Sequence, residues 1–239
     1  MKKTAVITGS SIGIGAAIAQ ELSNENMNIV INYNKSKEQA LKLLSELRQK
    51  GTQAIAIKAD VSKYDEAVNL INTAINEFGK VDILVNNAGI SCQKLFTDMS
   101  PSEFDDIFRV NLYSMFYCTQ VAIKDMLKRH YGKIINISSI WGITGASCEV
   151  AYSSSKAGVI GFTKSLAAEV YNEGVRVHAI SPGGVYTDMV KVSRPDLTPD
   201  GMIMPQEIAD IVLFLLKNRG NAIIDEIIVH RLNKQPFLV

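Results

Sequence analysis

The sequence lacks the features that mark membrane, secreted or nucleic-acid-binding proteins. Its 3 cysteines are far apart and lack metal-ligand spacing, which favours reduced thiols in a reducing compartment. No apolar run approaches membrane-spanning length, and the run after the first lysines is too short for a signal peptide. The net charge of +1 comes without a basic cluster, so nothing suggests nucleic acid. We therefore expect a cytoplasmic protein with no metal site, no membrane association and no nucleic-acid partner.

What the chain does contain is a regular alternation of short strand patterns and long helical patterns. Strands are predicted at 4–8, 28–33, 53–58, 81–86, 133–138, 175–181 and 226–230. Helices are predicted at 14–24, 37–50, 63–78, 111–129, 151–171 and 205–217, with another beginning at the capping box Ser100-Pro-Ser-Glu103. This alternation predicts an α/β protein. We expect a single doubly wound parallel sheet, a Rossmann fold, with helices on both faces and one domain over residues 1–239.

A glycine-rich segment connects the first predicted strand to the first helix. Gly9, Gly13 and Gly15 permit a tight turn and let the backbone approach a pyrophosphate at the positive end of the helix. Alone, such a segment is equally consistent with a simple turn. Its position after a strand and before a helix favours dinucleotide binding.

The end of the second strand is expected to face the adenosine ribose of that dinucleotide. The chain has Asn34, Lys35 and Ser36 there and no carboxylate, so a 2′-phosphate is not repelled and finds polar and cationic partners. This favours NADP (NADPH) over NAD. The alternative is a solvated surface loop with incidental lysines.

Tyr152 and Lys156 lie one turn apart in a predicted helix and project from the same face. A phenol has an unperturbed pKa of about 10, and a neighbouring ammonium group favours the phenolate. Such a pair occurs by chance in many helices, so its meaning depends on the other motifs.

Those motifs together resemble the short-chain dehydrogenase/reductase family, and most closely its bacterial 3-oxoacyl-[acyl-carrier-protein] reductases. In chain order they are the glycine-rich segment 8–15, Asp60-Val61, Asn86-Asn-Ala-Gly89, Asn111, Ser139, Tyr152-x-x-x-Lys156 and Pro182-Gly183. Each motif is weak alone, but their ordered sum over residues 4–190 is specific. The segments from Tyr113 and over Gly161 to Glu169 carry the likeness to the acyl-carrier-protein reductases.

The resemblance implies an NADP-dependent oxidoreductase that reduces a small or carrier-linked ketone to an alcohol by hydride transfer. In this reading Tyr152 is the general acid and Lys156 lowers its pKa and holds the nicotinamide ribose. Ser139 binds the substrate oxygen, and Asn111 positions a water that relays protons. The implied cofactor contacts are Gly9, Ser11, Ile12, Gly13, Ile14, Gly15, Asn34, Lys35, Ser36, Asp60, Val61, Asn87, Ala88, Gly89, Tyr152, Lys156, Pro182, Gly183, Val185 and Thr187.

The resemblance also implies a homotetramer or homodimer that pairs through the helices near 100–129 and 151–171. Two other functions stay open: an NAD-dependent dehydrogenase of a sugar, polyol or steroid alcohol, and a dinucleotide-sensing protein without catalysis. Ile12 stands where many NADP-dependent relatives have Arg. Segment 190–204 is shorter than the usual substrate lid, which suggests a more open pocket. The C-terminal region 221–239 departs from the family pattern, and its apolar end at 236–239 either packs on a neighbouring subunit or frays.

Overall fold

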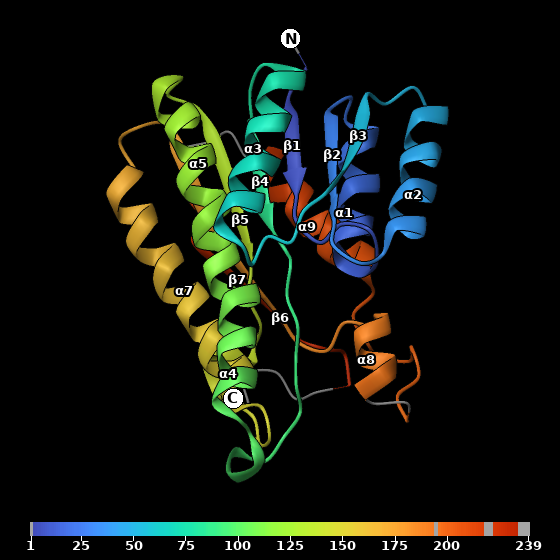
Figure 1. Cartoon of the computed structure of the whole chain (residues 1–239), viewed down its shortest axis with the longest axis vertical. Helices are drawn as coiled ribbons and strands as arrows, with labels where there is room; N and C mark the ends of the chain where they lie inside the picture. Colours follow the sequence, from blue (N-terminus) through green and yellow to red (C-terminus); the bar gives the residue numbers. More distant parts are fainter. Residues whose placement is uncertain (1, 194–195, 218–221, 234–239) are drawn as a thin grey trace.

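The computed structural model describes residues 2–193, 196–217 and 222–233 (Figure 1). Its strands are β1 (Thr4–Ile7), β2 (Asn28–Tyr33), β3 (Ala54–Lys58), β4 (Ile83–Asn86), β5 (Gly132–Ile137), β6 (Val175–Pro182) and β7 (Glu226–Val229). They form one parallel sheet in the order β3-β2-β1-β4-β5-β6-β7. The order reverses between β1 and β4, which confirms the doubly wound Rossmann-like sheet.

The helices are α1 (Gly13–Asn24), α2 (Lys37–Gln49), α3 (Tyr64–Phe78), α4 (Pro101–Phe108), α5 (Ser114–Lys128), α6 (Trp141–Thr144), α7 (Val150–Val170), α8 (Asp188–Ser193) and α9 (Pro205–Lys217). A 3-10 turn, η1 (Phe96–Asp98), and a π-helical turn, η2 (Arg109–Tyr113), complete the set. The predicted helix 111–129 is therefore an α-helix preceded by a π turn. Helix α8 was not predicted, because its segment is rich in loop-forming residues.

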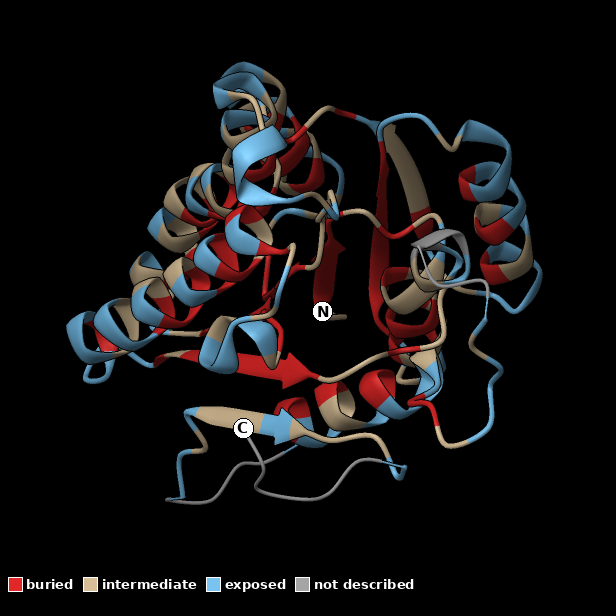
Figure 2. Ribbon diagram, turned by 90° about the horizontal axis from the view of Figure 1, so that it is seen from below, coloured by how far each residue is buried: buried red, intermediate tan, exposed pale blue. Residues whose placement is uncertain are grey.

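The core consists of two apolar clusters, one on each face of the sheet. Ala5 and Ile7 of β1 belong to the cluster under α1, α2 and α9, whereas Val6 belongs to the cluster under α3, α5 and α7. Successive side chains of a strand point to opposite faces, so a strand covered on both sides is apolar throughout. Figure 2 shows this layering, with buried strands between helices whose outer surfaces are exposed. Each fully buried side chain such as Leu84 contributes about 2 kcal/mol to stability.

Buried polar side chains link the central strands to two helices. Asn86 Nδ2 donates hydrogen bonds to Asn136 Oδ1 (2.8 Å) and to Thr119 Oγ1 of α5 (3.0 Å). Asn136 Nδ2 in turn donates to Thr163 Oγ1 of α7 (2.9 Å). These bonds fix α5 and α7 beside the carboxyl ends of β4 and β5, where the functional loops begin.

The apolar residues of α5, a helix in the region where subunit pairing is predicted, are explained partly by packing inside the subunit. Met115 and Met126 are buried, and Val121 and Ile123 pack against the core. Phe116 stays 41% exposed. The apolar end at 236–239 lies outside the described residues. Within the described part of the chain, no helix has the length and apolar character needed to cross a membrane.

Candidate active site

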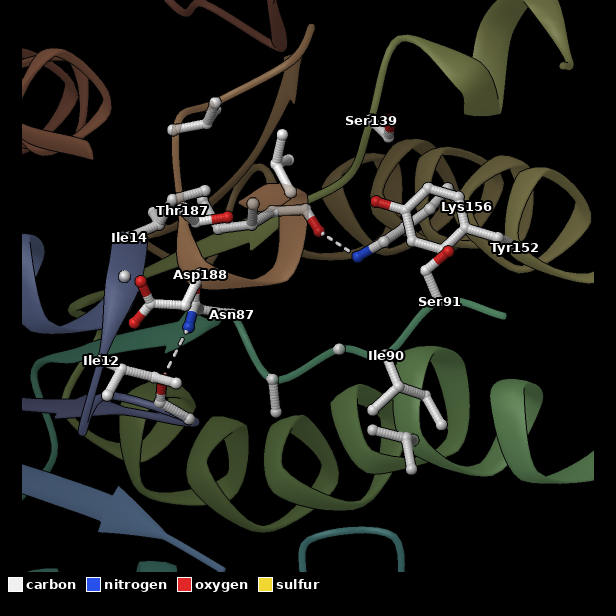
Figure 3. Close-up of a pocket in the computed structure, with 18 of the residues that line it drawn as sticks. Ile12, Ile14, Asn87, Ile90, Ser91, Ser139, Tyr152, Lys156, Thr187 and Asp188 are labelled. Atoms are coloured by element: carbon white, nitrogen blue, oxygen red, sulfur yellow. Dashed lines mark hydrogen bonds between the residues drawn. The ribbon is translucent and has the colours of Figure 1, made fainter. Parts of the chain in front are cut away.

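A cavity of about 850 Å³ lies at the carboxyl ends of the strands, where the strand order reverses (Figure 3). Such a reversal leaves a crevice between loops that diverge to opposite faces. The sequence-predicted residues that line it are Gly9, Ser11, Ile12, Gly13, Ile14, Asn34, Lys35, Ser36, Asp60, Val61, Asn87, Ala88, Gly89, Ser139, Tyr152, Lys156, Pro182, Gly183, Val185 and Thr187. Gly15 and Asn111 do not line it.

The glycine-rich turn is shaped for a ligand that approaches the backbone closely. Gly9 and Gly13 have φ values of +61° and +58°, a region that favours glycine, and a Cβ on Gly9 would lie 3.0 Å from Ala88 Cα. Ile12, the N-cap of α1, provides no side-chain cap, so the first N–H groups of this helix have no capping side chain. This cradle fits a pyrophosphate group.

Gly15 does not line the cavity and has a structural role, and its contact with the cofactor stays a prediction. A Cβ at this position would lie 2.6 Å from both Asn87 Nδ2 and the Gly9 carbonyl oxygen. That amide nitrogen donates to the carbonyl oxygens of Thr8 (3.0 Å) and Gly9 (3.1 Å). Gly15 therefore makes room for the bonds that tie the loop after β4 to the turn after β1.

The end of β2 presents Asn34, Lys35 and Ser36 to the cavity. Asn32, one of two asparagines in β2, also lines the cavity, and sequence reasoning assigned it no role. Its Oδ1 accepts from the Gly9 backbone N–H (3.0 Å) and its Nδ2 donates to the Ala59 carbonyl (3.0 Å). Asn32 thus holds the glycine turn against the end of β3.

Lys156 and Tyr152 project from α7 toward the same part of the cavity (Figure 3). Lys156 is only 4% exposed, and its Nζ donates to the Ile137 carbonyl (2.9 Å) and lies 5.7 Å from the centre of the Tyr152 ring. Burial lowers the pKa of Lys156 to about 8. Burial is also the main cause that raises the pKa of Tyr152 to about 12, against the opposing effect of a hydrogen bond with Ser139.

The pKa of Tyr152 is therefore raised overall, and the lowering expected from Lys156 stays a prediction. Desolvation of the phenolate outweighs the other influences, and a nearby carboxylate, Glu149, raises the pKa further. The phenol therefore keeps its proton at neutral pH. A protonated Tyr152 is suited to donate a proton to a substrate.

Ser139 and Asn111 differ in how directly they reach the cavity. Ser139 lines it, and its Oγ accepts from the Trp141 backbone N–H (3.2 Å). The buried Asn111 side chain lies in the π turn, where it accepts from the Ile90 N–H (2.8 Å) and donates to the Ile90 carbonyl and to Ser155 Oγ, both at 3.0 Å. Its amide therefore fixes the loop after β4 to α7. π turns of this kind often occur at functional sites.

Comparison with known proteins identifies the family. The model of the short chain dehydrogenase family matches residues 3–198. This chain belongs to the short-chain dehydrogenase family. It is similar to the 3-oxoacyl-[acyl-carrier-protein] reductase FabG of Staphylococcus epidermidis (41% identity; 82% of this chain and 81% of the relative). The FabG of Staphylococcus aureus is 38% identical (93% and 94%), and the 3-oxoacyl-[acyl-carrier-protein] reductase of Synechocystis sp. is 37% identical (93% and 92%).

Membership makes this dehydrogenase an NAD(P)-dependent oxidoreductase that acts on alcohol and carbonyl groups. The residues present fit a dinucleotide. The bare glycine turn suits the pyrophosphate, the end of β2 suits the adenosine ribose, and Tyr152 and Lys156 line the far part of the same cavity.

The cavity lining also contains residues that sequence reasoning did not single out. They are Ile90, Ser91, Gln93, Arg109, Trp141, Ser147, Glu149, Val190, Leu197, Met202 and Arg231. Val190, Leu197 and Met202 come from the short lid segment, whose residues 194 and 195 lie outside the described ranges. Glu149 had a usable signal, because it precedes Tyr152 by three positions and so falls on the same side of α7.

Proposed function

We propose that this dehydrogenase is an NADP-dependent reductase that converts a ketone to an alcohol by hydride transfer. A 3-oxoacyl thioester, free or carried by acyl-carrier protein, is the first substrate class to test, because the relatives are named for it. The observation that carries the proposal is that Tyr152, Ser139 and the buried Lys156 line one cavity of about 850 Å³, with Lys156 Nζ 5.7 Å from the centre of the Tyr152 ring.

NADPH, when bound, supplies the hydride. Ser139 donates a hydrogen bond to the carbonyl oxygen as negative charge develops on it, and Tyr152 transfers its proton to the same oxygen. Below its pKa of about 8, Lys156 is an ammonium group at neutral pH and stabilises the phenolate that remains. In the reverse direction the phenolate accepts the proton of the alcohol.

Asn111 serves the return of the proton in this proposal. Its Oδ1 and Lys156 Nζ both border Gly89, at 3.4 and 3.5 Å from the place where a side chain would begin. The glycine leaves room between these two groups, which supports a water that relays protons to Lys156.

The choice of NADP rests on the end of β2. Lys35 is exposed at the cavity edge beside Asn34 and Ser36, and that stretch contains no carboxylate to repel a 2′-phosphate. Asp60 also lines the cavity, but it follows β3, and its carboxylate accepts from the Ser62 N–H (3.2 Å) and hydroxyl (2.7 Å). Ile12 supplies no charge of its own.

The exposed side chains of Tyr113 (43%) and Phe116 (41%) support a homodimer or homotetramer that pairs through η2 and α5. Analytical ultracentrifugation of the wild type and of Phe116→Glu tests this. A wild-type monomer would contradict the pairing.

Fluorescence titration with NADPH and NADH, together with turnover of an acetoacetyl thioester, tests the function. We expect tighter binding of NADPH, and Tyr152→Phe should keep that binding and lose turnover. Lys35→Glu should weaken NADPH binding by about tenfold or more and leave NADH binding unchanged. The exposed Lys42→Glu on α2, outside the cavity lining, is the matched control for charge. Tighter NADH binding would favour the NAD-dependent alternative, and binding without turnover of any carbonyl would favour the sensor.

A further inference from the structure

Glu149 is a buried acidic residue that the proposed reaction does not use. It is only 3% exposed, and what remains accessible lines the cavity. It stands immediately before α7, three residues from Tyr152. Its Oε2 accepts a hydrogen bond from Ser91 Oγ at 3.0 Å.

The carboxyl group has more hydrogen-bonding capacity than its surroundings fill. An ionised carboxylate offers about four acceptor positions, and Ser91 occupies one. Burial raises the pKa of Glu149, and the opposing influence is the Ser91 hydroxyl. Among the described residues, no lysine, arginine or histidine pairs with Glu149. Burying such a group without a cation or further donors is costly, so its free positions call for a ligand.

Glu149 and Ser91 face the cavity from two loops that follow different strands. Ser91 belongs to the segment after β4, and Glu149 to the segment that leads from α6 to α7. A second bond, from the Lys94 N–H to the Cys148 carbonyl (2.8 Å), holds the two segments together. The Glu149 carboxylate raises the pKa of Tyr152, so the two groups are within electrostatic reach. Ser91 and Tyr152 both line the cavity (Figure 3).

We propose that Glu149 and Ser91 form a specificity site that binds a hydroxyl group of the substrate, a few bonds from the carbonyl group that is reduced. A hydroxyl can donate to the carboxylate and accept from a neighbouring donor, so it satisfies both members of the pair. An alkyl group in the same place would leave the carboxyl group desolvated without a partner. The inference rests on the proposed carbonyl reduction and predicts a preference, among its carbonyl substrates, for those that also carry a hydroxyl group.

Calorimetry with a matched pair of ketones tests the site. Protein saturated with NADP+ is titrated with benzylacetone and with its β-hydroxy derivative, which differ by one hydroxyl group. We expect the hydroxyketone to bind about tenfold tighter, the effect of one hydrogen bond to a charged group. Glu149→Met, which keeps the side-chain length, should bring the ratio of affinities close to one, and Ser91→Ala should lower it. Glu149→Gln should keep most of the preference for the hydroxyketone.

Asp106→Asn is the control, because Asp106 is a second carboxyl group on the cavity lining and should leave the ratio unchanged. Each variant is first titrated with NADPH to show that it is folded. If Glu149→Met does not bind NADPH, the Ser91→Ala variant decides the question. Equal affinities in the wild type, or a ratio that survives both Glu149→Met and Ser91→Ala, would overturn the specificity site. Turnover of benzylacetone and its loss in Tyr152→Phe test the proposed reaction separately. Selective binding of the hydroxyketone without turnover of benzylacetone would contradict the proposed reaction but not the specificity site.

Discussion

Replacing Lys156 by Met should stabilise the protein at neutral pH while it abolishes catalysis. Lys156 is 4% exposed and pairs with no carboxylate among the described residues, and its ammonium group donates to the neutral carbonyl of Ile137. Burial lowers its pKa from 10.5 to about 8. A lysine that is easier to deprotonate in the folded state than in the unfolded state destabilises the fold wherever it is charged.

The size of the expected stabilisation follows from the shift in the pKa of Lys156. The change from 10.5 to about 8 corresponds to roughly 3 kcal/mol at neutral pH, where the group is protonated in both states. Loss of the hydrogen bond to Ile137 destabilises the variant by about 1 kcal/mol. Lys156→Met should therefore gain about 2 kcal/mol, which raises Tm by roughly 4–8 °C for a chain of this size.

The difference in stability between the wild type and Lys156→Met should depend on pH. Between about pH 8 and 10.5 the unfolded state binds more protons than the folded state, so the stability of the wild type rises with pH. The advantage of Lys156→Met should shrink over that window. Thermal unfolding at a series of pH values measures it, with Lys124→Met, an exposed lysine on α5, as the control. A lower Tm at neutral pH, or a difference that does not shrink, would refute the reasoning.

Three further outcomes follow from single contacts. Gly15→Ala should lower NADPH affinity at least tenfold, because its Cβ would lie 2.6 Å from a backbone oxygen, whereas Gly161→Ala, which meets nothing within 4 Å, should bind NADPH normally in the same titration. Asp82→Asn removes a buried charge paired with two cations and should lower the free energy of unfolding in urea by about 3 kcal/mol; a loss below about 1 kcal/mol would show that the pairs contribute little. Glu149→Gln removes a charge that raises the pKa of Tyr152, so the pH profile of alcohol oxidation should shift to lower pH, and a shift to higher pH would contradict this electrostatic role.

The features that sequence predicted best are those set by short stretches of chain. The capping box at Ser100 begins α4 as expected, with the Ser100 Oγ accepting from the Glu103 N–H (3.2 Å). The buried strands are recognisable because both their faces are apolar. The glycine turn and the Tyr152 and Lys156 pair are local motifs, and both line the cavity.

The features that sequence did not predict depend on how distant segments meet. Ser91 and Glu149 are separated by 58 positions and come together because β4 and β5 are neighbours in the sheet. The pKa of Tyr152 depends on burial by the folded chain, which the spacing to Lys156 does not reveal. The π turn at Arg109–Tyr113 has no residue signature that distinguishes it from the helix that follows.

The bonds that Asn87 and Asn32 make to the glycine turn have a consequence for how this protein can change. They join β1, β2 and β4 by bonding two side-chain amides to backbone atoms of the turn, so the part of the cavity that suits a dinucleotide tolerates little variation. The walls near Ser91 and Glu149 are instead built from side chains on separate loops. New substrate preferences can therefore arise by exchange of a few loop side chains, while the machinery for hydride transfer is inherited intact.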